Sequence, residues 1–136
     1  MGDIIKTFPS RSSTKEKIQL LKYYFDTGSP RTFVKEFAAL KMKGVLKLPQ
    51  PKQFFGLGNG GFKATYMVSL EVQLLDMWVP HPCFVVPDDV LDEEYDALLG
   101  NDFMQIYDIH LKPKERDIVI NKGALRMALK VRNIVK

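Results

Sequence analysis

Apolar and polar residues alternate over several short segments of the chain, and a two-residue period is typical of strands that bury one face. The alternation is regular over residues 65–74, which we expect to form a strand. An apolar and aromatic segment at 18–25, interrupted by Lys22, predicts another strand. Further strands are expected at 3–8 and 83–86, a loop at 9–14, and a hairpin of 109–111 with 117–120 around 112–116.

Helical spacing replaces this alternation in two places. Residues 32–40 carry apolar side chains on one side, which predicts a short helical turn. Residues 101–107 predict a second short helix directly after Gly100. Between the strands, the segment 47–62 contains two prolines and then four glycines within six positions, which is typical of a mobile hairpin tip.

The C-terminal segment fits both periods. Its apolar residues alternate with basic ones, which favours a terminal strand with a basic outer face. Apolar residues also recur there at helical spacing, so a helix over 124–135 is the alternative. The alternating set consists of Leu125, Met127, Leu129 and Val131 against Arg126, Lys130 and Arg132.

Length and composition indicate one domain. The 136 residues are 46% hydrophobic, enough for a core that is small relative to the surface. We divide the domain into an N-terminal strand and loop at 1–17, a core at 18–120 and a C-terminal strand or extension at 121–136. The formal charge of +4 and the pI near 9.1 come from basic residues spread along the chain, so we expect no nucleic-acid partner.

Cysteine usage and hydropathy bear on the compartment. The single cysteine, Cys83, cannot form an internal disulfide, whereas small proteins of oxidising compartments more often carry several cysteines. Residues 1–6 lack the apolar stretch of a signal peptide, and no apolar run approaches the roughly 20 residues of a membrane span. We therefore expect a soluble, cytoplasmic protein that binds no membrane.

Candidate chemistry is concentrated in Asp26-Thr27-Gly28-Ser29, at the end of the strand predicted at 18–25. Hydrolysis of an amide by water needs one carboxylate that accepts a proton and one carboxyl group that donates a proton. Two carboxyl groups in close contact cannot both ionise cheaply, so they share one proton. The motif therefore indicates half of an aspartic protease active site, with Asp26 as the catalytic residue.

The second carboxylate has to come from another chain, because the sequence contains no other Asp-Thr-Gly or Asp-Ser-Gly. A closed dimer places the same side chain on both sides of one peptide bond. We therefore expect a homodimer that hydrolyses peptide bonds and needs no cofactor. His81, Cys83 and the distant His110 are too few neighbouring ligands to predict a metal site.

These features together resemble the retropepsin family, the homodimeric aspartic proteases of retroviruses, retrotransposons and some cellular proteins. The resemblance covers residues 18–120. It rests on the catalytic motif after its apolar strand, on the glycine-rich segment 56–62, and on the segment 97–104. The last segment is similar to the one that crosses behind the family's catalytic turn and begins a helix, and its structural motif is Leu98, Leu99 and Gly100.

The resemblance implies an all-β fold, namely a small closed β-barrel with a flap hairpin and one short helix, assembled as a homodimer. It also implies that the flap folds over an extended peptide substrate, offers backbone N–H groups to it and excludes water. Leu57 and Phe62 are then expected to line the cleft and to favour bulky apolar side chains at the cut site. The expected flap residues are Gly56, Leu57, Gly58, Asn59, Gly60, Gly61 and Phe62.

The resemblance also assigns roles to the residues that follow Asp26. The Thr27 hydroxyl is expected to reach the partner's backbone across the two-fold axis, and Gly28 to let the substrate backbone approach closely. The Ser29 hydroxyl is expected to donate to the Asp26 carboxylate, which favours the ionised form. These roles predict an acidic pH optimum.

One departure from the family concerns the connection between the catalytic turn and the helix. Many retroviral enzymes pair an aspartate in the turn with an arginine after the late glycine, whereas this chain has Pro30 and Asn101 at those positions. Both charges are absent together, so no ion is left unpaired, but the connection is lost.

Two alternatives to an active protease remain. One is a catalytically silent retropepsin-like module for dimerisation or peptide binding. The other is a basic all-β domain that binds nucleic acid through Arg126, Lys130, Arg132 and Lys136.

Overall fold

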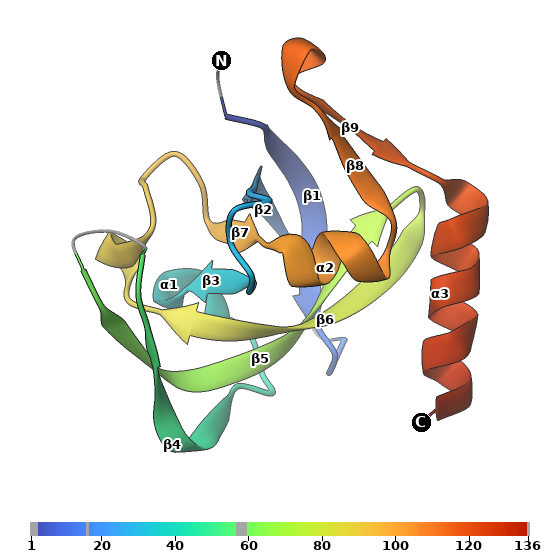
Figure 1. The fold of residues 1–136 in the computed structure, drawn as a ribbon. Coiled ribbons are helices and arrows are strands. Elements are labelled where there is room, and N and C mark those ends of the chain that lie inside the picture. Colours follow the sequence, from blue (N-terminus) through green and yellow to red (C-terminus); the bar gives the residue numbers. More distant parts are fainter. Residues whose placement is uncertain (1–2, 16, 57–59, 136) are drawn as a thin grey trace.

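Six strands close into a barrel in the computed structural model, which describes residues 3–15, 17–56 and 60–135 and side chains up to Val131 (Figure 1). The sheet order is β1-β2-β7-β3-β6-β5-β4, and β1 also pairs with β5, which closes the ring and leaves β4 outside it. The strands are β1 (Ile5–Ser12), β2 (Gln19–Phe25), β3 (Phe33–Lys35), β4 (Leu46–Phe54), β5 (Phe62–Leu74), β6 (Met77–Val86) and β7 (Ala97–Leu99).

The remaining elements lie around this barrel. A separate two-stranded sheet consists of β8 (Ile109–Lys112) and β9 (Asp117–Ile120). The helices are α1 (Glu36–Ala39), α2 (Asn101–Ile106) and α3 (Lys122–Val135), with 3-10 turns η1 (Asp88–Val90) and η2 (Pro113–Glu115). The small closed barrel and the helix after Gly100 are confirmed, but the described residues form three α-helices where the resemblance implied one.

The core is apolar and continuous through the barrel. Strand β5 shows the alternation that predicted it, because Val68, Leu70 and Val72 are buried whereas Met67 is half-buried and Ser69 is exposed. A second cluster of buried residues lies where β3 meets the hairpin of β4 and β5. Its members are Phe33, Val86, Leu91, Tyr95 and Leu98.

Three predictions about segments that form barrel strands differ from the structure. The loop expected at 9–14 is strand as far as Ser12, because pairing with both β2 and β5 extends β1 through Pro9. The helical turn expected at 32–40 is limited to α1, because buried β3 is held between β6 and β7. Strand β6 begins six residues before Cys83, since its prolines lie where it pairs with β5 but not yet with β3.

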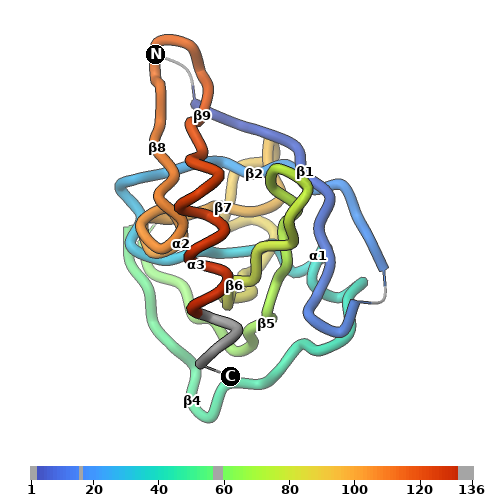
Figure 2. The backbone as a smooth tube through the Cα atoms, turned by 90° about the vertical axis from the view of Figure 1, so that its right-hand side faces the viewer, coloured from blue at the N-terminus to red at the C-terminus, as the bar shows by residue number. Residues whose placement is uncertain are grey.

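The C-terminal strand prediction is wrong, because residues 122–135 form α3. Asn121 caps this helix: its side-chain oxygen accepts the N–H of Ala124, and its carbonyl accepts the N–H of Leu125. Leu125 is fully buried in the barrel core, and Leu129 packs against that core. The helix lies along the barrel (Figure 2). Among the described residues, no helix is long and apolar enough to cross a membrane.

Candidate active site

Asp26 lies in a turn at the end of β2, which is flanked by β1 and β7. Its N–H donates to Leu99 O at 3.0 Å, and its carbonyl accepts the N–H of Ser29 at 3.1 Å. The Gly28 N–H donates to Asp26 Oδ1 at 2.9 Å and so orients the carboxylate. Asp26 is half-buried, while Thr27 and Gly28 are exposed. The barrel therefore presents one oriented carboxylate at its surface.

The segment that ends at Gly100 crosses directly behind this turn, as the sequence predicts. Strand β7 runs parallel to β2, with Leu99 opposite Phe25. The N–H of Asn101 donates to Ser29 O at 2.7 Å. A β-carbon on residue 100 would lie 2.2 Å from Arg31 O and 2.7 Å from Ser29 O, so only glycine fits this crossing.

The hydroxyl of Ser29 does not reach the Asp26 carboxylate. It donates to Arg31 O at 2.8 Å instead, and the side chain is buried. The turn directs Ser29 inward, toward its own loop, because its backbone groups bond to Asp26 and Asn101. Ser29 thus stabilises the turn, and the expected hydrogen bond to Asp26 was wrong.

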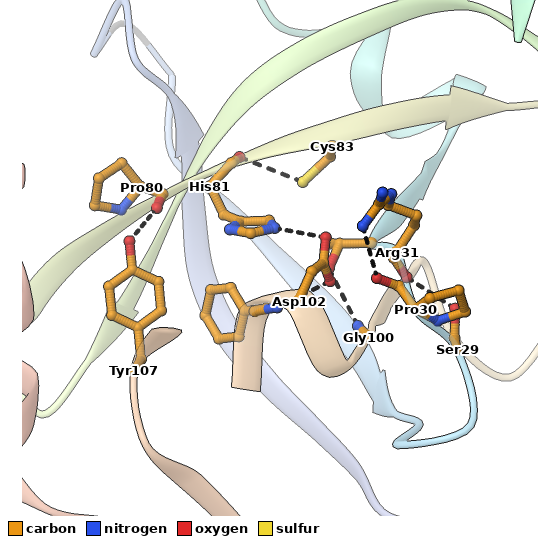
Figure 3. Close-up of polar contacts among 11 residues, drawn as sticks. Ser29, Pro30, Arg31, Pro80, His81, Cys83, Gly100, Asp102 and Tyr107 are labelled. Atoms are coloured by element: carbon orange, nitrogen blue, oxygen red, sulfur yellow. Dashed lines mark hydrogen bonds and ion pairs between the residues drawn. The ribbon is translucent and has the colours of Figure 1, made fainter. Parts of the chain in front are cut away.

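A buried polar cluster connects the turn, the helix and β6. We call it the Asp102 network; it consists of Thr32, His81, Asp102 and the N–H of Gly100. The Gly100 N–H donates to Thr32 Oγ1 at 3.1 Å, and Thr32 Oγ1 donates to Asp102 Oδ1 at 2.8 Å. His81 Nε2 lies 2.9 Å from Asp102 Oδ2 (Figure 3). Sequence reasoning missed this cluster, because its members are far apart in the chain.

Opposing effects act on the pKa of Asp102. Burial alone would raise that pKa, but hydrogen bonds from His81, Thr32 and the Phe103 N–H, together with attraction to His81, lower it below the usual value. The carboxylate is therefore held in its ionised form at the start of α2, where a negative charge is also favoured by the helix dipole.

The glycine-rich hairpin is present as the connection of β4 and β5. Gly56 and Gly60 have φ of +95° and +108°, backbone conformations that favour glycine. Gly61 and Phe62 follow, whereas Leu57, Gly58 and Asn59 lie outside the described residues.

Aromatic packing joins the base of this hairpin to the barrel. Phe54 and Phe62 stack with ring centroids 5.5 Å apart, and both contact Phe33. Phe33 begins β3, which follows the catalytic turn. Phe62 is thus half-buried in an aromatic cluster, and Phe55 beside it is 80% exposed.

The other candidate ligands are spread apart. The described residues contain no group of three or more side chains able to hold a metal ion. Cys83 Sγ contacts His81 O, and burial raises the pKa of this thiol well above its usual value. His110 lies on β8, where it pairs with Asp108 at 2.7 Å on the surface.

A hollow of about 480 Å³ opens beside the turn that carries Asp26. Thr27 and Asn101 line one side of it, and side chains of α2 and β8, including Met104 and Leu111, line the rest. Asp26 is not among its lining residues. The hollow therefore flanks the carboxylate on the face that also exposes Thr27.

Comparisons with known proteins support the fold. No protein-family model matches the sequence, and no curated protein matches it. The retroviral protease-like domain of Ddi1 from Leishmania major superposes with a TM-score of 0.54 at 14% identity, over 85% of this chain and 87% of that domain. EIAV protease complexed with the inhibitor HBY-793 superposes with a TM-score of 0.51 at 16% identity, over 79% of this chain and 91% of that one. The chain thus has a retropepsin-like fold, as its sequence predicts.

Proposed function

We propose that the protein is a homodimeric aspartic endopeptidase whose two Asp26 carboxylates, one from each subunit, activate the attacking water. The observation that carries this proposal is the position of Asp26 within a retropepsin-like fold. Its carboxylate is accessible, its orientation is fixed by the Gly28 N–H, and its turn is backed by Gly100.

The surface around Thr27 supports dimer formation. Thr27 is exposed and lines the hollow beside the turn, so a two-fold partner placed against Asp26 would cover both. Strands β8 and β9 border this region and, among the described residues, pair only with each other. Their outer edges keep backbone groups that a second copy can bind. In that dimer the Thr27 hydroxyl reaches the backbone of the partner subunit.

The chemistry follows from two carboxyl groups that share one proton. The ionised group accepts a proton from water as the water oxygen bonds to the peptide carbonyl carbon, and the protonated group donates its proton to the carbonyl oxygen. The C–N bond then breaks as the proton taken from water is passed to the leaving nitrogen. A β-carbon on residue 28 would lie 3.2 Å from Asp26 Oδ1 and would crowd this site, so Gly28→Val should abolish substrate binding. Because the pair has to retain one proton, activity is expected to be highest in acid. The reaction requires no cofactor.

The substrate is an extended peptide bound between the turn and the hairpin of β4 and β5. Backbone groups of the hairpin can pair with such a peptide as a further strand. The exposed ring of Phe55 and the aromatic residues at the hairpin base favour bulky apolar side chains near the cut site.

The proposal is tested by cleavage of denatured casein from pH 3 to 7. Wild type, Asp26→Asn and wild type with a statine-type inhibitor are compared at several protein concentrations. Acid-favoured cleavage that is lost with Asp26→Asn and with the inhibitor supports the mechanism. Absence of cleavage by a chain shown to be folded and dimeric contradicts it and favours the catalytically silent module.

A further inference from the structure

The catalytic turn is mechanically coupled to the start of α2. Gly100 leaves no space between its backbone and the carbonyl groups of Ser29 and Arg31, and the Asn101 N–H bonds to Ser29 O. Packed backbones without voids transmit small displacements. A shift of α2 by a few tenths of an ångström therefore moves the turn that carries Asp26.

Thr32 fixes the helix start in one direction. Its hydroxyl accepts the Gly100 N–H and donates its own hydrogen to Asp102 Oδ1, so both of its capacities are used. The Thr32 side chain is fully buried, which excludes competing water. Thr32 lies between the catalytic turn and β3. Its two hydrogen bonds therefore connect the segment after the turn with the start of α2.

His81 holds Asp102 from the other side. Asp102 Oδ1 accepts from Thr32 and from the Phe103 N–H, which leaves Oδ2 for His81 Nε2. The imidazole is 96% buried and packs edge-on against Phe103 at 5.3 Å between ring centroids. Its position on β6 ties the helix start to the long hairpin of β5 and β6 (Figure 3).

The second ring nitrogen of His81, Nδ1, destabilises the fold. Among the described residues, no atom forms a hydrogen bond with buried His81 Nδ1. A buried polar atom without a hydrogen-bond partner destabilises a fold. An apolar side chain would avoid this cost but would leave Asp102 Oδ2 without a donor, which costs more for a charged group. The structure thus keeps a costly histidine for its Nε2.

We propose that His81 and Asp102 are positioning residues that hold the catalytic turn of Asp26 in its working geometry, an inference that rests on the proposed function. The turn and the helix start also carry the uncharged residues Pro30 and Asn101. The Asp102 network connects the same two segments through Thr32 and Gly100. Neither His81 nor Asp102 touches the substrate in this role.

The experiment compares His81→Phe, which keeps an aromatic ring but loses the donor, with His81→Gln, which restores an N–H donor. The matched control is Glu71→Gln, which breaks the partly buried ion pair with Arg11 (2.7 Å) between β1 and β5. For each folded variant, kcat and KM are measured on casein-derived peptide, together with amide hydrogen exchange at Asp26, Gly100 and Asn101.

We expect His81→Phe to lower kcat about tenfold or more with KM within about twofold, because a small misplacement of reacting groups slows chemistry more than binding. His81→Gln should recover most of kcat, and Glu71→Gln should leave it unchanged. The three amides should exchange faster in His81→Phe only.

Three outcomes overturn the inference: unchanged kcat and exchange in His81→Phe, no recovery in His81→Gln, or an equal loss of kcat in Glu71→Gln. If wild type cleaves nothing, the proposed function fails, and the exchange rates still report whether His81 holds the turn. If His81→Phe does not fold, Thr32→Val and Thr32→Ser form the second pair. Only Thr32→Val removes the hydroxyl, so it alone should lose kcat and protection.

Discussion

Gly100 lies so close to the carbonyl group of Arg31 that a β-carbon on residue 100 would come within 2.2 Å of the carbonyl oxygen. Two segments separated by 68 residues thus meet backbone to backbone behind Asp26. The backbone of β7 and the start of α2 therefore set the position of the turn that carries Asp26.

Gly100→Ala should therefore destabilise the fold and abolish cleavage. The added methyl group meets main-chain atoms that cannot rotate away, and such overpacking costs typically about 1–3 kcal/mol, occasionally more. Urea unfolding and the casein assay measure the two effects. Gly123→Ala is the control, because that helical position has space for a β-carbon, and alanine should stabilise α3 by about 0.5–1 kcal/mol. A fully active Gly100→Ala protein would contradict the close backbone contact between Gly100 and Arg31.

Sequence periodicity predicted the barrel well where one period dominated. The alternation along β5 and the apolar run of β2 extend over enough residues that side-chain packing and strand propensity favour the same structure. Periodicity was insufficient at 32–40, where strand pairing on both sides makes the first residues of the expected helical turn, Phe33–Lys35, part of β3. It was also insufficient at the C-terminus, where both periods fit and Asn121 was the overlooked signal for a helix start.

Leu125→Ala tests the position of α3. Leu125 is fully buried in the barrel core, so its truncation should lower the free energy of unfolding by about 2–5 kcal/mol. Met127→Ala is the control, because that side chain is 61% exposed and its truncation should change stability by less than about 0.5 kcal/mol. Chemical denaturation measures both. Equal effects of the two substitutions would show that α3 does not pack as described.

The sequence predicted only those parts of the site whose residues are adjacent in the chain or lie in a recognisable segment. Asp26, Thr27 and Gly28 are adjacent, and Gly100 lies in a recognisable segment. The Asp102 network is different, because its side chains meet only once the barrel closes. The spacing of His81 and Cys83 indicated only that they are too few for a metal site, whereas burial and the carboxylate of Asp102 determine what His81 does.

Acid stability should depend on Asp102. Its pKa is lower in the folded protein than in the unfolded chain, so the ionised group stabilises the fold above its unfolded pKa of about 3.9. That contribution is lost as the pH falls through the lower, folded pKa. Asp102→Asn should thus be less stable than wild type near pH 7, with a difference that shrinks toward pH 3.

Urea unfolding at each pH measures this difference. Asp117→Asn is the control: Asp117 also has a lowered pKa, from the Ile118 N–H and Lys6, but it is exposed, so solvent screens its interactions. Its difference from wild type should stay small at every pH. A constant difference for Asp102→Asn between pH 3 and 7 would show that its charge does not contribute.

Thr27→Ala should weaken the dimer before it affects anything else. In the proposed dimer the substitution removes two symmetry-related hydrogen bonds from the interface, and at about 0.5–1.5 kcal/mol each this raises the dissociation constant by roughly 5- to 150-fold. Thr27→Ser keeps the hydroxyl and should behave like wild type. Sedimentation equilibrium gives the dissociation constants. As the protein is diluted, specific activity should begin to fall at a higher protein concentration for Thr27→Ala than for Thr27→Ser. If wild-type specific activity is independent of concentration in a sample shown to be monomeric, one chain suffices for catalysis and the second Asp26 is not needed.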